Sequence, residues 1–83
     1  MVIHVGFGGS VATTRVLAIA GVDAAPIRRA VRQAEADDQL IDLTHGRRRQ
    51  SVLFLDSGHI VLSATSADIL AQRMSEGVNC GND

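Results

Sequence analysis

The stretch SVLFLDSGHIVLSA, residues 51–64, is the part of the sequence that predicts the fold most directly. Two apolar runs, 51–56 and 59–64, flank Ser57-Gly58, and this dipeptide is typical of a tight turn. The pattern predicts two strands that are joined by a short turn and run in opposite directions. The other predicted elements lie on both sides of this hairpin.

The N-terminal part of the sequence predicts two further strands. Residues 2–7 alternate loosely between apolar and other positions, which is typical of a strand with one buried face. Gly8-Gly9 predicts a turn. Residues 10–20 are rich in Val, Ile, Thr and Leu, so we expect one second strand there, bent near Arg15.

A helix is predicted to begin at Pro26, because proline is favoured in the first turn, where its missing N–H would have no helical partner. Its apolar residues recur on one helical face; they are Ile27, Ala30, Val31 and Ala34. Asp37-Asp38 is expected to end the helix, and residues 40–44 predict a strand. We expect residues 44–50 (THGRRRQ) to form a hairpin tip between this strand and the next.

Thr65-Ser66-Ala67-Asp68 has the form of a capping box and predicts the start of a last helix. This helix is expected to run to about Glu76 and to stop at Gly77, and the polar tail 77–83 is expected to be disordered. The order ββαβββα indicates an α+β fold, with a small, mainly antiparallel sheet and two helices. We expect a single domain over residues 1–76.

The composition favours self-association. The chain has 83 residues, of which 46% are hydrophobic, and so short a chain has only a thin core. Its one cysteine, Cys80, cannot form an intramolecular disulfide. Because small proteins without disulfides or metals often gain stability by assembling, we expect a homo-oligomer.

No targeting segment is recognisable in the sequence. No run reaches the roughly 18 apolar residues that a transmembrane helix needs. The N-terminus lacks the basic and apolar regions of a signal peptide. With a single cysteine as well, we expect a cytoplasmic protein with no membrane partner.

The candidate catalytic groups form no recognisable site. The glycine-rich stretch 6–10 lacks the lysine and the spacing of a phosphate-binding loop. His4, His45 and His59 match no zinc pattern, and we interpret them as polar strand or turn residues. We predict no catalytic residue, no metal ligand, no cofactor and no small-molecule substrate, and we expect no enzymatic activity.

Arginine is the unusual feature of the composition. The chain has no lysine, and its formal net charge is −1. Seven of its eight arginines lie within residues 15–49; they are Arg15, Arg28, Arg29, Arg32, Arg47, Arg48 and Arg49. On a helix, Arg28, Arg29 and Arg32 can equally form a solvated face. The run 47–49, by contrast, has no acid within four residues on either side.

This run predicts an anionic partner. A guanidinium group forks onto phosphate oxygens or onto the edge of guanine. Single strands are usually held by stacking on aromatic side chains, and this chain has only two aromatic residues. Duplex DNA needs only phosphate contacts and a few contacts to base edges, so it is the expected partner.

The sequence resembles the RemA family of small bacterial regulators of extracellular-matrix genes. The resemblance covers roughly residues 1–75 and rests on many blocks in a fixed order. These are Val5-Gly6-Phe7-Gly8, Thr14-Arg15, Ala25-Pro26-Ile27, Leu40-Ile41-Asp42, Gly46-Arg47-Arg48, Asp56-Ser57-Gly58-His59, Ile60-Val61-Leu62-Ser63-Ala64 and Leu70-Ala71-Gln72-Arg73-Met74.

The resemblance implies a nucleoid-associated transcription regulator with a fold similar to the LytTR type of DNA-binding domain. It also implies a ring-shaped homo-oligomer with DNA along its outer rim. Arg47 and Arg48 match the family's paired DNA-contacting arginines, and Arg15 matches a further basic position. Arg49 departs from the family pattern, in which the third basic residue lies one position further along, so its contact with DNA is expected to differ.

Two alternatives stay open. In the first, the protein is an oligomeric interaction module without DNA binding, and its arginines pair with Asp37, Asp38 or Asp42 of a neighbouring protomer. In the second, it is a regulator that binds a small anion or nucleotide at the glycine turn of residues 6–10.

Overall fold

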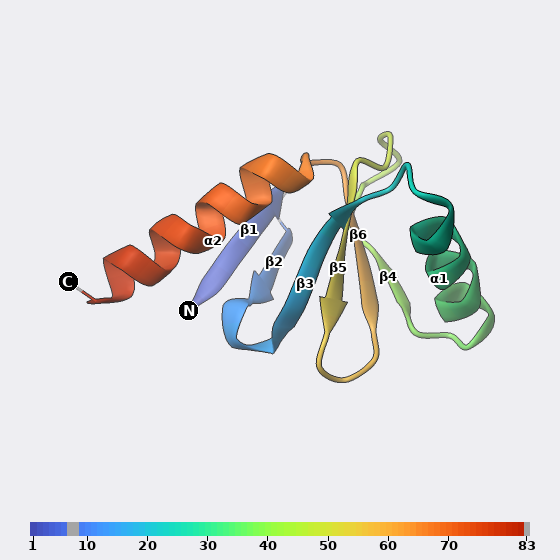
Figure 1. The fold of residues 1–83 in the computed structure, drawn as a ribbon, viewed down its shortest axis with the longest axis horizontal. Helices are drawn as coiled ribbons and strands as arrows, with labels where there is room; N and C mark the ends of the chain where they lie inside the picture. The colour runs from blue at the N-terminus through green and yellow to red at the C-terminus, as the bar shows by residue number, and fades with distance from the viewer. Residues whose placement is uncertain (7–8, 83) are drawn as a thin grey trace.

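The chain forms a four-stranded sheet with a helix at each side and a separate two-stranded sheet (Figure 1). The computed structural model describes residues 1–6 and 9–82. Its elements are β1 (Val2–Gly6), β2 (Gly9–Ala12), a 3-10 turn η1 (Thr13–Arg15), β3 (Val16–Gly21), α1 (Ala25–Ala36), β4 (Leu40–Asp42), β5 (Ser51–Leu55), β6 (Ile60–Ser63) and α2 (Ala67–Asn82). The predicted α+β class is confirmed, whereas the similarity to the LytTR type stays a prediction.

The predicted hairpin of residues 51–64 forms the centre of the larger sheet, whose strand order is β3-β5-β6-β4. β5 and β6 pair antiparallel, and the Leu55 N–H donates to the His59 carbonyl at 3.0 Å where the two strands meet the turn. Gly58 has a φ of 91°, which residues with a side chain rarely adopt, so this turn requires glycine. β4 pairs in parallel with the other side of β6, which makes the sheet mixed.

The single strand predicted over residues 10–20 is wrong, because the structure divides it into β2 and β3. β2 pairs with β1 in the small sheet, whereas β3 pairs with β5 in the large one. The turn η1 lies between them, and its Arg15 carbonyl accepts a hydrogen bond from the Asp56 N–H at 2.8 Å. The bend predicted near Arg15 coincides with η1, but both halves have strand character, so the pattern does not show that they belong to different sheets.

Apolar residues on the two faces of the larger sheet build two cores. The β1–β2 hairpin and α2 cover one face; the buried residues there are Ile3, Val5, Val11, Leu53, Val61 and Leu70. α1 covers the other; the buried residues there are Val31, Ala34, Val52, Ile60 and Leu62. Because successive side chains of β5 point to opposite faces, its unbroken apolar run serves both cores.

The two helices begin close to their predicted positions. Pro26 lies in the first turn of α1, and Asp37 is the C-cap residue, both as predicted. At the start of α2 the cap differs by one residue, because the Oγ of Ser66, and not that of Thr65, accepts a hydrogen bond from the Ile69 N–H at 3.3 Å. Thr65 makes a different contact, which is described below.

The end of α2 differs from the prediction. The helix continues past Gly77 to Asn82, so the predicted stop at this glycine is wrong. Glycine inside a helix costs about 1 kcal/mol relative to alanine, but it keeps the backbone N–H that the helix needs. The disorder expected for residues 77–83 stays a prediction.

Hydrogen bonds of small polar residues fasten the two sheets together. The Ser63 Oγ and the Thr65 Oγ1 both donate to the Val5 carbonyl, at 2.8 and 3.2 Å. The Ser51 Oγ donates to the Thr65 carbonyl at 2.6 Å, and both serines are fully buried. A buried polar group without a partner costs about 1–3 kcal/mol, so this network fixes the ends of β5 and β6 relative to β1.

Candidate nucleic-acid interface

The segment that carries the three consecutive arginines is a crossover and not the predicted hairpin tip. We call residues 43–50 the arginine crossover. It joins β4 to β5, but β6 lies between these strands, so the segment passes the end of β6 (Figure 1). The Gln50 N–H donates to the Ser63 carbonyl at 2.9 Å where the crossover reaches β5. Strands that are consecutive in sequence usually pair. Here β5 pairs with β6, to which a tight turn joins it, and not with β4, which precedes it in the sequence.

A tight turn over residues 44–47 leads the chain into the arginines. The Arg47 N–H donates to the Thr44 carbonyl at 3.0 Å. The two central residues, His45 and Gly46, have φ values of 54° and 79°. Positive φ at both central positions defines a type I′ turn. Glycine adopts this conformation freely, so Gly46 is the residue that allows the turn directly before Arg47.

Asp42 anchors the start of the crossover. Its Oδ1 accepts hydrogen bonds from the Thr44 hydroxyl at 2.6 Å and from the Thr44 N–H at 2.9 Å. These two bonds, the hydroxyl bond first, hold the pKa of the Asp42 carboxyl below its ordinary value, and the positive charge of Arg49 lowers this pKa further. Thr44 is buried, with 2% of its surface exposed, so the turn starts from a fixed point.

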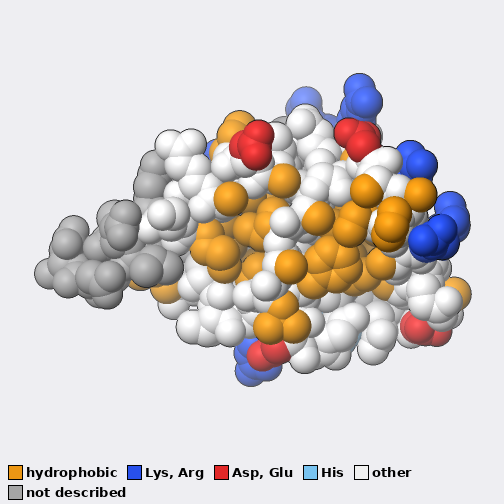
Figure 2. Space-filling view, viewed as in Figure 1, with side chains coloured by type: hydrophobic (Ala, Val, Ile, Leu, Met, Phe, Trp, Pro, Cys, Tyr) orange, Lys and Arg blue, Asp and Glu red, His pale blue; other side chains and the backbone are white. Residues whose placement is uncertain are grey.

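The structure brings five of the seven predicted arginines to one side of the molecule. Arg47, Arg48 and Arg49 are exposed on the crossover, and Arg49 lines a cleft together with Arg28 and Arg32 of α1. Figure 2 shows blue basic side chains at the upper and right-hand borders of the molecule, where Figure 1 places the crossover and α1, and another at the lower border.

The sixth, Arg29, is also exposed on α1, but unlike Arg28 and Arg32 it does not line this cleft. Two of the three predicted arginines of α1 therefore lie at the cleft.

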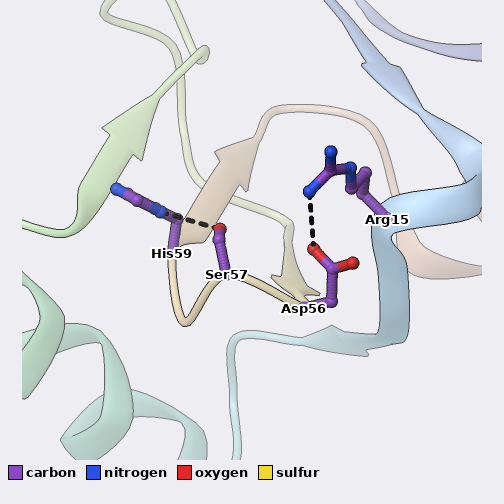
Figure 3. Close-up of polar contacts among 4 residues, drawn as sticks. All are labelled: Arg15, Asp56, Ser57 and His59. Carbon is purple, nitrogen blue, oxygen red and sulfur yellow. Dashed lines mark hydrogen bonds and ion pairs between the residues drawn. The ribbon is translucent and has the colours of Figure 1, made fainter.

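Arg15 lies at the opposite end of the central strands. Gly21, at the far end of β3, pairs with Ser51 beside the crossover, and a strand of this length spans roughly 17 Å. The Arg15 Nη1 lies 3.6 Å from the Asp56 Oδ1, with 65% and 42% of the two side chains exposed (Figure 3). Such an exposed pair contributes little stability, so Arg15 can exchange it for another anion.

Two of the three histidines hydrogen-bond to serine side chains. The His4 Nδ1 lies 3.0 Å from the Ser10 Oγ on the neighbouring strand β2. The His59 Nδ1 lies 2.8 Å from the Ser57 Oγ in the β5–β6 turn (Figure 3). His45 forms part of the type I′ turn. The glycine turn predicted at Gly8-Gly9 falls partly outside the described residues.

The described residues contain neither a cluster of potential metal ligands nor a helix that could span a membrane. In residues 1–6 and 9–82, no three His, Cys, Asp or Glu residues gather as metal ligands. No helix within the same ranges combines the length and the apolar character of a transmembrane span.

The sequence analysis missed one exposed apolar surface. β3 lies at the edge of its sheet, and Leu17 on it is 72% exposed. A groove of about 530 Å³ runs between β3 and α2, lined by residues 16–19 and by Ala71, Met74 and Ser75. Figure 2 shows apolar side chains across the middle of one face. The unbroken apolar run VLAIA at 16–20 was the signal that could have identified this surface.

Comparison with known proteins gives consistent matches along almost the whole chain. Residues 2–74 match the model of the family described as extracellular matrix regulatory protein A-like, or RemA-like. A protein of Dictyoglomus turgidum named "Putative regulatory protein" is 47% identical over 75 residues, covering 90% of this chain and 88% of the relative.

Two further relatives carry similar names. A "Putative regulatory protein" of Synechococcus elongatus is 47% identical over 72 residues, covering 87% of this chain and 83% of the relative. One of Dehalococcoides mccartyi is 42% identical over 73 residues, covering 88% and 76%. These matches confirm the resemblance seen in the sequence, and the chain belongs to the RemA-like family.

Proposed function

We propose that the protein is a transcription regulator that binds duplex DNA as a homo-oligomer. The observation that carries this proposal is the arginine crossover, where a type I′ turn anchored by Asp42 presents three consecutive exposed arginines. The family match and the names of the relatives support the regulatory role. The family description makes extracellular-matrix genes the proposed targets, and a DNA partner places the protein at the nucleoid.

Arg47 and Arg48 form the centre of the proposed interface. Arg47 is the last residue of the type I′ turn and Arg48 follows it directly, so the hydrogen bond that closes the turn positions the backbone of this pair. Their planar guanidinium groups suit phosphate oxygens and the O6 and N7 atoms of guanine. Arg49, together with Arg28 and Arg32 of α1, extends the positive surface at the same side.

Arg15 provides a second DNA contact that is separate from the crossover, because it lies at the other end of β3. In an oligomer, each protomer would add one crossover and one Arg15 to the DNA-binding surface. Several weak contacts on one duplex then give an avidity that a single protomer lacks.

The exposed surface of β3 supports self-association. Leu17 is 72% exposed, and the adjoining groove against α2 is lined mainly by apolar side chains. An edge strand also offers backbone N–H and C=O groups to a further strand. A chain this small gains stability when a second copy covers such a surface.

The alternative of an interaction module receives less support, because two of its three acids already have partners within the chain. Asp42 accepts two hydrogen bonds from Thr44. Asp37 accepts one from the Gln33 Nε2 at 3.1 Å. Pairing with arginines of a neighbouring protomer would compete with these contacts.

The proposal is tested by fluorescence anisotropy with a labelled duplex at several salt concentrations. Each neutralised phosphate adds about −0.9 to the slope of log affinity against log salt, so an oligomer with several crossovers should give a steep slope. A slope near zero would contradict DNA binding through the arginines.

Two double variants separate charge from geometry. Changing Arg47 and Arg48 to alanine should abolish binding, whereas changing both to lysine should keep the salt dependence and lose affinity, because lysine cannot form the bidentate contact. The oligomer mass, measured by light scattering, should stay that of the wild type in both variants. If the alanine variant dissociates into protomers, the crossover is an oligomer interface and the proposal is wrong.

A further inference from the structure

A cleft of about 450 Å³ separates α1 from the arginine crossover. Its polar lining consists of Arg28 and Arg32 from α1, Arg49 from the crossover, and Asp23 from the segment after β3. A second hollow of about 310 Å³ shares Asp23 and Arg49 with it and is also lined by Arg48. The two hollows therefore adjoin each other at Arg49.

Local geometry directs the three arginines into this cleft from two elements. Arg28 and Arg32 are one helical turn apart and so lie on the same side of α1. Arg49 comes from the far side of the cleft, on the crossover. With Asp23 included, the cleft has a formal net charge of +2.

These arginines are not neutralised by an ion pair. Among the described residues, no carboxylate oxygen lies within 4.0 Å of the guanidinium nitrogens of Arg28, Arg32 or Arg49, and the ion pair of Arg15 with Asp56 lies at the other end of β3. The three guanidinium groups outnumber the single carboxylate of Asp23, and such an excess of positive charge in a cleft raises the local concentration of anions. The cleft therefore favours an anion.

The size and the floor of the cleft indicate what kind of anion fits. Ligand sites for small molecules occupy about 300–1,000 Å³, and this cleft falls in that range. Its apolar lining includes the half-buried Val22 and Val31, which is 7% exposed, and these two residues offer contact to a flat ring above the fully buried Leu62. Asp23 can accept hydrogen bonds from the hydroxyl or amino groups of a ligand.

We propose that this cleft binds a small organic phosphate of about the size of a mononucleotide. The phosphate contacts Arg28, Arg32 and Arg49, and the organic part lies over Val22 and Val31, above the buried Leu62. This site differs in place from the glycine turn that the sequence suggested as a nucleotide site.

The ligand would also regulate DNA binding, a consequence that rests on the proposed function. Arg49 belongs to the same crossover as the proposed DNA-contacting pair, Arg47 and Arg48. A phosphate in the cleft attracts the guanidinium of Arg49 and adds negative charge beside Arg48. Bound ligand should therefore weaken the affinity for duplex DNA.

The first experiment measures ligand binding without DNA. The wild-type oligomer is titrated with adenosine 5′-monophosphate, guanosine 5′-monophosphate, inorganic phosphate and adenosine, by calorimetry and by the methyl NMR signals of Val31 and Leu62. At least one mononucleotide should bind more tightly than inorganic phosphate and shift both methyl groups, and adenosine should not bind. Equal binding of inorganic phosphate and mononucleotides overturns the organic part of the proposal. Absence of binding by all four overturns the whole.

Matched variants on α1 test where the ligand binds. Arg32→Ala should weaken mononucleotide binding about tenfold or more, because it removes a charge-assisted hydrogen bond. Arg29→Ala removes the same charge from the same helix outside the cleft, and it should change the affinity by about twofold or less. Equal losses in the two variants would mean unspecific attraction and would overturn the site.

A competition experiment separates this proposal from the proposed function. Mononucleotide should lower the affinity for a labelled duplex in the wild type and have less effect in Arg32→Ala. If mononucleotide binds but duplex DNA does not, the proposed function fails and the ligand site stands. If duplex DNA shifts the methyl signals of Val31 and Leu62 and mononucleotide does not, the cleft belongs to the DNA interface and the ligand proposal is overturned.

Discussion

Replacing Gly46 with alanine tests whether the shape of the crossover matters in addition to its charge. A Cβ at Gly46 would meet no heavy atom within 4 Å, so the change causes no clash. Its φ is +79°, however, and a residue with a Cβ pays about 1–2 kcal/mol in the left-handed region. The whole cost therefore arises from the backbone of the type I′ turn.

This cost should appear in one of two measurements. If the turn keeps its shape, the free energy of unfolding falls by about 1–2 kcal/mol, and each kcal/mol lowers the Tm of a domain this small by about 4–8 °C. If the turn relaxes, Arg47 and Arg48 lose their positions and the affinity for duplex DNA falls up to about tenfold. The assays are urea unfolding followed by circular dichroism, since the chain has no Trp or Tyr, and anisotropy with a labelled duplex.

Two other glycines provide the controls. A Cβ at Gly21 also meets nothing within 4 Å, and this residue has no positive φ, so Gly21→Ala should change stability by about 0.5 kcal/mol or less. Gly6 has a φ of +95°, and its Cβ would lie 2.8 Å from the Thr65 Oγ1, so Gly6→Ala should be the most destabilising of the three. If Gly46→Ala equals Gly21→Ala in both stability and DNA affinity, the reasoning about the turn is refuted.

Three further substitutions test the interface, the polar network and the anchor. Leu17→Asp should reduce the oligomer mass in light scattering and leave the circular dichroism spectrum unchanged, because Leu17 is 72% exposed; an unchanged mass would exclude β3 as the interface. Ser63→Ala should cost about 1–3 kcal/mol in urea unfolding, whereas the exposed Ser57→Ala should cost about 0.5 kcal/mol or less, and equal costs would contradict the proposed role of the network. The pKa of Asp42 is lowered in the folded state, so its carboxylate stabilises the fold above its unfolded pKa of about 3.9, and this contribution disappears as the pH falls through the folded pKa. Asp42→Asn should therefore be less stable than wild type at pH 7, and the difference should shrink as the pH falls below about 3.9, so a difference that grows in acid would contradict this assignment.

Local signals in the sequence predicted most of the elements correctly. The hairpin of residues 51–64, the helix that begins at Pro26 and the start of the last helix near Ser66 all follow from turn residues, caps and periodicity. These signals act within a few residues, so they can be interpreted without the rest of the fold. The family resemblance was confirmed for the same reason, because it rests on blocks of sequence in a fixed order.

These local signals did not show which strands pair with one another when the strands are distant in sequence. The strand pattern of residues 10–20 is the same whether the segment pairs with one partner or two, so the division between β2 and β3 was missed. Likewise, residues 43–50 have the composition of a turn, and their sequence does not indicate that β6 lies between β4 and β5, the strands that they connect.

The sequence by itself determined the α+β class, the family and the identity of the charged residues, since each of these depends on residue types and local spacing. Only the tertiary structure decided how the arginines are grouped. It joins Arg49 to Arg28 and Arg32 across a cleft, and it separates Arg15 from them by the length of β3. The physical reason is that side chains distant in sequence meet according to the order of strands in the sheet. That order is set by competition among several possible strand pairings, which depends on the whole chain.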